Sequence, residues 1–126
     1  MWEKPDEFDW VKKDPLEKLG MEGFCKVVCE FLHDRLRDAE IWGFPGEISF
    51  EHVYLVQNGR AIDIKGLRSV EEVIDDVKPK TEARQITREE LAKAFFISDD
   101  DRDSRTIFRQ RLAAYLEENR AKFGLD

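Results

Sequence analysis

The sequence predicts a single α+β domain in which a central helix packs on a small antiparallel sheet and further helices lie on the outside. Three observations favour this class. Asn58-Gly59 separates two β-rich runs within residues 50–64. Residues 24–36 have the apolar character of a buried helix, and residues 99–123 carry a long amphipathic pattern. We therefore expect helices packed around one antiparallel hairpin.

The size and charge of the chain limit the classes of function. Its 126 residues, 41% of them hydrophobic, suit one compact domain with one modest core. The net charge of −7 disfavours nonspecific binding to nucleic acid or to anionic lipid. No apolar run approaches the roughly 20 residues of a membrane helix, and the first residues lack the basic and then apolar order of a signal peptide. We expect a cytoplasmic protein that binds neither nucleic acid nor membrane.

The first 20 residues are predicted to form an N-terminal helical segment with one or two short helices. Apolar side chains recur there at loose helical intervals, and two prolines stand near the expected element starts. These apolar residues are Phe8, Trp10, Val11, Leu16 and Leu19. Gly20 and Gly23 then bracket a predicted turn, and the buried helix over 24–36 follows it.

A loop, the hairpin and a short helix are expected next. Residues 43–47, Gly-Phe-Pro-Gly-Glu, have the turn chemistry of a loop. After the hairpin, Ser69 and Glu72 form a capping-box pattern that opens a helix ending near Val77. Residues 21–77 therefore make up the predicted core helix plus hairpin.

The C-terminal part, residues 78–126, is predicted to be helical. Thr87-Arg88-Glu89-Glu90 forms a second capping-box pattern, and apolar residues follow it as far as Ile97. The amphipathic pattern over 99–123 predicts one continuous helix with Gly124 as its stop.

The Asn58-Gly59 pair also predicts the register of the hairpin. A two-residue type I′ turn places Gln57 opposite Arg60, and counting back along the strands places Tyr54 opposite Asp63. Because side chains alternate between faces, the strands divide into an apolar face and a mixed face. The apolar face holds Val53, Leu55, Ile62 and Ile64, and the mixed face holds His52, Tyr54, Val56, Ala61 and Asp63.

This register makes His52 and Asp63 diagonal neighbours on the mixed face. Backbones at such positions are about 7–8 Å apart, a gap that these side chains can close with a hydrogen bond. We expect the helix over 24–36 to cover this face. Its first turn holds Cys25, whose thiolate the helix dipole would stabilise, whereas Cys29 lies one turn deeper. The chemistry predicted is a nucleophile, a base and an orienting acid: Cys25, His52 and Asp63.

These residues carry a resemblance to a known superfamily. The segments GFCKVVCEFLHDRL and HVYLVQNGRAIDIKG resemble the core of the papain-like and transglutaminase-like thiol superfamily. In particular they are similar to small bacterial and phage proteins of that superfamily with Gly-x-Cys, then His-Val, then Gly-Arg-x-x-Asp-x-x-Gly. The resemblance covers roughly residues 20–75. It implies a papain-like fold and acyl transfer through a thioester.

The predicted function is thiol-dependent hydrolysis of an amide or ester, or acyl transfer, as in a peptidase, deamidase or transglutaminase. Cys25 would be the nucleophile, His52 the general base and later acid, and Asp63 the orienter. The substrate would be a protein or peptide, and no cofactor is needed. Trp42 and Trp10 are candidates for binding the substrate, as is Glu22 for lining the site.

A metal site is a competing interpretation of the cysteines. Cys25, Cys29 and His33 recur every four residues along one helical stripe. The outer two would lie about 12 Å apart, too far to share an ion with ligand bonds of about 2.0–2.3 Å. One adjacent pair with His52 is a weaker alternative, and we expect no metal.

Each predicted site residue also has a purely structural interpretation. Cys25 could be a small buried hydrophobe, His52 a strand-edge residue bonded to solvent, and Asp63 a strand-ending residue bonded to backbone amides near Gly66. The alternative function is then a non-catalytic acidic module that binds a protein partner, for instance a phage or bacterial modulator on the same fold.

Overall fold

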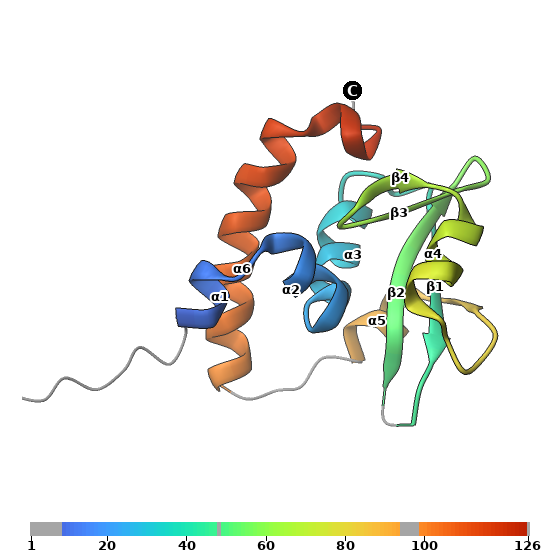
Figure 1. The fold of residues 1–126 in the computed structure, drawn as a ribbon, viewed down its shortest axis with the longest axis horizontal. Coiled ribbons are helices and arrows are strands. Elements are labelled where there is room, and N and C mark those ends of the chain that lie inside the picture. The colour runs from blue at the N-terminus through green and yellow to red at the C-terminus, as the bar shows by residue number, and fades with distance from the viewer. Residues whose placement is uncertain (1–8, 48, 94–98, 126) are drawn as a thin grey trace, which may run out of the picture.

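The protein is an α+β structure built on one antiparallel sheet, which confirms the predicted class (Figure 1). The computed structural model describes residues 9–47, 49–93 and 99–125, and in these ranges six α-helices and one short 3-10 helix accompany five strands. The strand order across the sheet is β4-β3-β2-β1-β5, and every neighbouring pair is antiparallel.

Among the described elements, three helices precede the first four strands, one helix stands between the fourth and fifth strands, and the remaining helices follow the fifth strand. The strands are β1 (Glu40–Pro45), β2 (Phe50–Gln57), β3 (Arg60–Asp63), β4 (Gly66–Arg68) and β5 (Arg84–Ile86). The helices are α1 (Asp9–Lys13), α2 (Leu16–Glu22), α3 (Cys25–His33), α4 (Val70–Val77), α5 (Arg88–Lys93), α6 (Asp99–Glu118) and the 3-10 helix η1 (Arg120–Phe123).

The main core lies between α3 and one face of the sheet. The predicted apolar face of the hairpin does point into this core, packed against buried residues of α3. On its other side α3 is covered by α6, with the rings of Phe24 and Phe108 stacked 4.5 Å apart (Figure 1). A helix that is apolar on most sides needs two covers, and here the sheet and α6 supply them.

The mixed face of the hairpin is covered by α4, so the expectation that the helix over 24–36 would cover it is wrong. Figure 1 shows α4 on the side of the sheet opposite α3. Val73 of α4 forms a second buried cluster with Phe44, Tyr54 and Ala61. The physical reason is that α4 has one narrow apolar stripe, which suits an outer helix, whereas α3, which is apolar on most sides, belongs in the larger core.

The predicted loop over 43–47 is also partly wrong, because Gly43, Phe44 and Pro45 belong to β1. They pair with β2, Gly43 opposite Val53 and Phe44 opposite His52, before the register shifts at Pro45. The turn-forming residues show only that a loop would be tolerated here. They do not predict that β1 pairs with a strand on each of its sides.

Both capping boxes form as predicted. The Ser69 hydroxyl accepts from the N–H of Glu72 at 3.1 Å and the Glu72 carboxylate accepts from the N–H of Ser69 at 3.2 Å. Thr87 and Glu90 do the same at 3.0 and 3.2 Å. Helix α4 ends at Val77 as expected, and the predicted continuation of α5 toward Ile97 falls outside the described residues.

The helix expected over 99–123 is interrupted. Helix α6 ends at Glu118, and Asn119, with φ −129°, separates it from η1. The Asn119 side-chain amide donates to the carbonyl of Tyr115 at 2.8 Å, so it occupies a carbonyl that a continuing helix would bond with its backbone. Gly124, with φ 69°, is the stop as predicted.

At the N-terminal end, α1 and α2 agree with the expected short helices, but Gly20 lies inside α2 and only Gly23 lies in the turn. A Cβ on Gly20 would stand 2.6 Å from atoms of Ile64. Glycine at this position therefore lets α2 approach the sheet closely, and this tertiary contact explains a glycine that the sequence pattern assigned to a turn.

Candidate functional site

The hairpin turn brings two of the predicted site residues together. Asn58 and Gly59 have φ values of 54° and 76°, as a type I′ turn requires. The observed pairs between β2 and β3 match the predicted register: Gln57 with Arg60, Val56 with Ala61 and Leu55 with Ile62. The ladder ends there, so the strands are not paired at His52 and Asp63.

His52 and Asp63 form a buried hydrogen bond. Their Nε2 and Oδ2 atoms are 3.1 Å apart, and the two side chains are only 1% and 2% exposed. A buried polar pair of this kind costs free energy unless its hydrogen bonds are made. The diagonal contact predicted from the register is therefore present.

Asp63 has two further partners. Its Oδ1 accepts from the backbone N–H of Lys65 at 3.0 Å, and its Oδ2 accepts from Nη2 of Arg68 at 2.6 Å. Burial raises the pKa of Asp63, but the hydrogen bonds from His52 and Arg68 outweigh it and lower the pKa below its ordinary value. Asp63 is therefore an ionised carboxylate.

Cys25 is the first residue of α3 and lies next to His52. Cys25 is 7% exposed, and His52 and the backbone of Val53 are the neighbours that favour its thiolate. In this hairpin every second residue back from Gln57 directs its N–H toward β3, and Val53 is one of them. Because the ladder with β3 has already ended, this N–H is left for the sulfur.

Cys25 and His52 each stabilise the charged form of the other, the thiolate and the imidazolium. Burial raises the pKa of the Cys25 thiol, but the hydrogen bond and the charge of His52 outweigh it, so the pKa is lowered. Burial lowers the pKa of His52, while Asp63 and Cys25 raise it to about 9. With Nε2 on Asp63, Nδ1 is the nitrogen left for the thiol. Nδ1 is buried and has no hydrogen-bond partner among the described residues.

The other cysteine and the other histidine are placed differently. Cys29 is buried in the main core, where burial and the neighbouring Cys25 raise its pKa. His33, at the far end of α3, has Nδ1 2.9 Å from Nη1 of Arg88. Among the residues with described positions, no group of three or more His, Cys, Asp or Glu side chains is arranged to hold a metal ion.

A cavity of about 900 Å³ borders the cluster. His52 is part of its wall, whereas Cys25 is not. The cavity lies between α2, the start of β2 and the end of α4, and is lined by Pro15, Glu17, Lys18, Met21, Glu51, His52, Lys65, Asp76, Val77, Lys78 and Lys80. His52 borders this cavity at the start of β2, and its side chain is only 1% exposed.

Neither predicted substrate-binding tryptophan is part of this wall, and their role in binding a substrate stays a prediction. Trp10 stacks on Phe24 with ring centroids 5.7 Å apart, next to the start of α3. Trp42 packs with the cluster under α4 and bonds Glu40 through Nε1 at 3.4 Å. Periodicity places a residue on an element but does not say which cavity that element borders. The side chain of Glu22 is outside the described part of the structure.

Sequence reasoning missed Arg68, which binds both Asp63 and Asp76. The sequence nevertheless contained a signal for the contact between Asp63 and Arg68. Strands β3 and β4 form a second tight hairpin with Asp63 opposite Gly66 and Ala61 opposite Arg68. The same diagonal rule that joined His52 to Asp63 joins Asp63 to Arg68.

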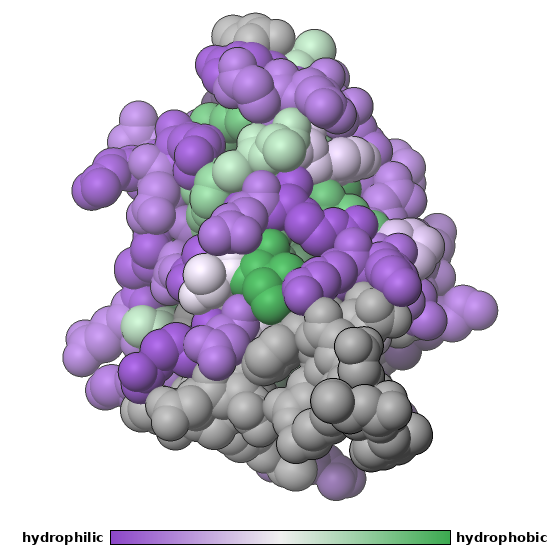
Figure 2. Space-filling view, turned by 90° about the vertical axis from the view of Figure 1, so that its left-hand side faces the viewer, coloured by the Kyte–Doolittle hydropathy of each residue, from purple (hydrophilic) through white to green (hydrophobic). Residues whose placement is uncertain are grey.

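The face over α1 and α6 is largely hydrophilic, with small apolar areas between polar side chains (Figure 2). In the described ranges, no helix combines the length and apolar character that a bilayer span requires.

No protein-family model, curated protein or solved structure matched this chain in the comparisons made. Function has therefore to be inferred from the side chains themselves.

Proposed function

We propose that this protein is a thiol-dependent amide or ester hydrolase, or acyltransferase, of the papain-like or transglutaminase-like type, acting on a protein or peptide. One observation carries the proposal. A cysteine at the start of a helix, a histidine and an ionised aspartate meet in one buried cluster, with the pKa of Cys25 lowered and that of His52 raised. This is the charge pattern of an activated thiol nucleophile.

The reaction divides into two steps. The Cys25 sulfur attacks the carbonyl carbon of the substrate, and the proton held on His52 passes to the leaving amine or alkoxide as the carbon–nitrogen or carbon–oxygen bond breaks. A thioester remains. Water or a second amine then gives a proton to His52 and attacks the thioester, which releases the acyl group and returns the proton to the thiol–imidazole pair.

The start of α3 can stabilise the oxyanion that forms in each step. The first N–H groups of a helix have no partner within the helix, and Phe24 provides no side-chain cap. The N–H groups of Cys25 and Lys26 therefore remain as donors next to the reacting sulfur, at the positive end of the helix dipole.

Asp63 and Arg68 act by positioning the imidazole. Asp63 accepts from Nε2, which leaves Nδ1 for the thiol, and it stabilises the imidazolium form. Arg68 touches no reacting group in this scheme. It holds Asp63 in place by donating to Oδ2, the same oxygen that bonds His52, so it is a positioning residue.

A second candidate is the non-catalytic module that binds a protein partner. The observation that favours it is that Cys25 is almost fully buried and does not border the cavity beside His52. Folds are routinely reused without their chemistry, so the cluster could then serve stability alone.

Alkylation of the native protein by iodoacetamide separates the two candidates. The rate at each cysteine is followed from pH 5 to 9 by mass spectrometry of the digested protein. An enzyme site predicts that Cys25 reacts at pH 6, where a free thiol is almost wholly protonated, and that His52→Ala slows this reaction by about tenfold or more. His33→Ala is the matched control, because it removes the chain's other histidine.

The opposite outcome is equally clear. If Cys25 reacts no faster than Cys29 or a model thiol, and His52→Ala and His33→Ala behave alike, the enzyme proposal is wrong and the binding module takes its place.

A further inference from the structure

The cavity beside His52 differs in charge from the protein as a whole. The chain carries a net charge of −7, yet the lining of this cavity contains more ammonium groups than carboxylates. The lysines are Lys18, Lys65, Lys78 and Lys80, and the acids are Glu17, Glu51 and Asp76. A local excess of positive charge in an acidic protein indicates that the ligand of this cavity is an anion.

Two of the three carboxylates are bound by cations. Asp76 accepts from Nζ of Lys65 at 2.6 Å and from Nη1 of Arg68 at 3.0 Å. Glu17 lies 3.1 Å from Nζ of Lys122. Since Arg68 and Lys122 add charge from outside the lining, these acids do little to offset the remaining lysines.

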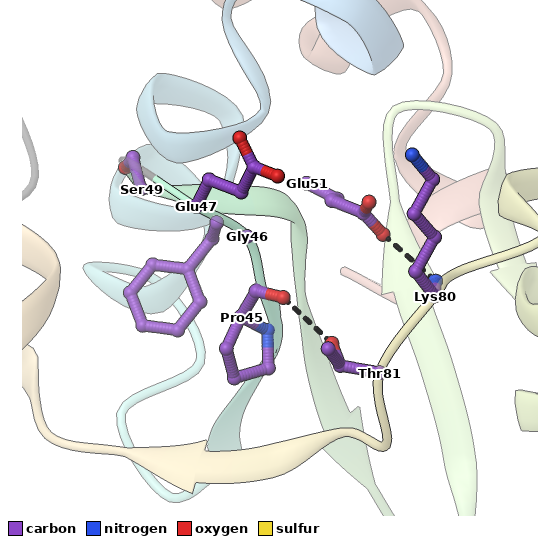
Figure 3. A pocket seen from close by; sticks show the side chains of 8 residues that line it. Pro45, Gly46, Glu47, Ser49, Glu51, Lys80 and Thr81 are labelled. Atoms are coloured by element: carbon purple, nitrogen blue, oxygen red, sulfur yellow. Dashed lines mark hydrogen bonds between the residues drawn. The ribbon is translucent and has the colours of Figure 1, made fainter.

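The third carboxylate is held by backbone. Glu51 accepts through Oε2 from the N–H of Lys80 at 3.2 Å, the bond drawn in Figure 3 in the neighbouring pocket. Because this bond uses the backbone of Lys80, the ammonium group of Lys80 takes no part in it. Within the described part of the chain, Lys18, Lys78 and Lys80 have no carboxylate within ion-pair distance of their ammonium groups.

The three lysines come from two sides of the cavity. Lys18 is on α2, and Lys78 ends α4 in the left-handed conformation, with φ 52°. Lys80 follows two residues later, after Pro79. Three separate ammonium groups suit several carboxylates spread along a chain. A single phosphate is recognised better by a guanidinium fork, and Arg68 already uses its own on Asp63 and Asp76.

We propose that this cavity binds an acidic stretch of the peptide substrate, with carboxylates against Lys18, Lys78 and Lys80 and the reactive carbonyl next to His52. This inference rests on the proposed function, because it assigns the substrate of that same site. It makes the protein selective for acyl groups flanked by aspartate or glutamate.

A pair of alkylating reagents tests the assignment. Iodoacetate is an anion and iodoacetamide is neutral, but both react with the same thiolate. The ratio of their rates at Cys25 therefore cancels any change in thiolate fraction and reports the local potential. The ratio at glutathione serves as the reference.

Single variants remove the lysines one at a time. Lys18→Gln and Lys80→Gln remove a charge, and Lys78→Asn does so with a side chain that tolerates the left-handed backbone. Each should lower the iodoacetate-to-iodoacetamide ratio by about twofold at low ionic strength, and 0.5 M salt should abolish the difference. The matched control is Lys93→Gln, an exposed lysine paired with Glu89 and outside the cavity lining, which should leave the ratio unchanged.

Protection by a ligand gives a second readout. Triglutamate peptide should slow the reaction of Cys25 with iodoacetamide, and triglycine should not. The effect should weaken in the three lysine variants and persist in Lys93→Gln.

The outcomes separate the two proposals. Fast reaction of Cys25 with iodoacetamide, but a ratio that the lysine variants leave unchanged and no protection by triglutamate, overturns the acidic substrate and leaves the thiol enzyme standing. Protection by inorganic phosphate but not by triglutamate also overturns the assignment of a peptide. Slow reaction with both reagents overturns the thiol enzyme and the substrate inference together.

Discussion

Arg68 donates from Nη2 to Oδ2 of Asp63 at 2.6 Å, and that same oxygen lies 3.1 Å from Nε2 of His52. The carboxylate is therefore shared between a cation that is always charged and an imidazole whose charge depends on pH. With the side chain of Asp63 only 2% exposed, neither contact is replaced by water if it is lost.

Arg68→Met should destabilise the protein by about 3 kcal/mol, because it removes one partner of a buried carboxylate. Arg60→Met is the control, since Arg60 is exposed at the hairpin end and should change the free energy of unfolding by no more than about 0.5 kcal/mol. Urea unfolding at pH 7 measures both. Equal losses in the two variants would mean that the Asp63 contact contributes nothing of its own.

Asp63→Asn should lower the pKa of His52 from about 9 by one to three units, because an opposite charge in contact is lost. NMR titration of the imidazole measures this. The native pKa lies above the ordinary value of 6.5, so the stabilisation from protonated His52 is complete below about 6.5 and is lost as the pH rises through about 9. The wild type should therefore lose more stability than Asp63→Asn between pH 6 and 10. A His52 pKa that stays near 9 in the variant would contradict this.

Cys29→Ser should lower the free energy of unfolding by about 1–3 kcal/mol, because it buries a hydroxyl in an apolar core that provides no hydrogen-bond partner for it. Cys25→Ser should cost less, because the new hydroxyl can bond His52 and the backbone of Val53 in place of the thiol. Thermal unfolding of the two variants gives the order directly. The reverse order would show that Cys25, not Cys29, is the structural cysteine.

Gly20→Ala should destabilise by about 1–3 kcal/mol even though alanine is the better helix former, because its Cβ would stand 2.6 Å from Ile64. Gly23→Ala is a close control, since nothing lies within 4 Å of a Cβ there. Both are compared by urea unfolding. If Gly20→Ala were neutral or stabilising, α2 would have to pack less tightly on the sheet than described here.

The features that the sequence predicted correctly are local ones. Asn58-Gly59 fixed the register of its own hairpin, and the register put His52 and Asp63 within reach of each other. The capping boxes at Ser69 and Thr87 each depend on residues three apart. Such patterns involve short stretches of chain whose geometry is set by turn type and side-chain alternation, so they can be worked out by counting.

The tertiary structure decided which face of the sheet each helix covers, because that depends on segments far apart in the chain competing to bury apolar surface. It placed α4, not α3, over Tyr54, and it gave β1 its partners on both sides. It also determined that Trp10 and Trp42 do not border the cavity beside His52. The sequence by itself determined the pairing of His52 with Asp63, whereas only the packing of α3 against the start of β2, beyond the end of the β2–β3 ladder, brought Cys25 to them.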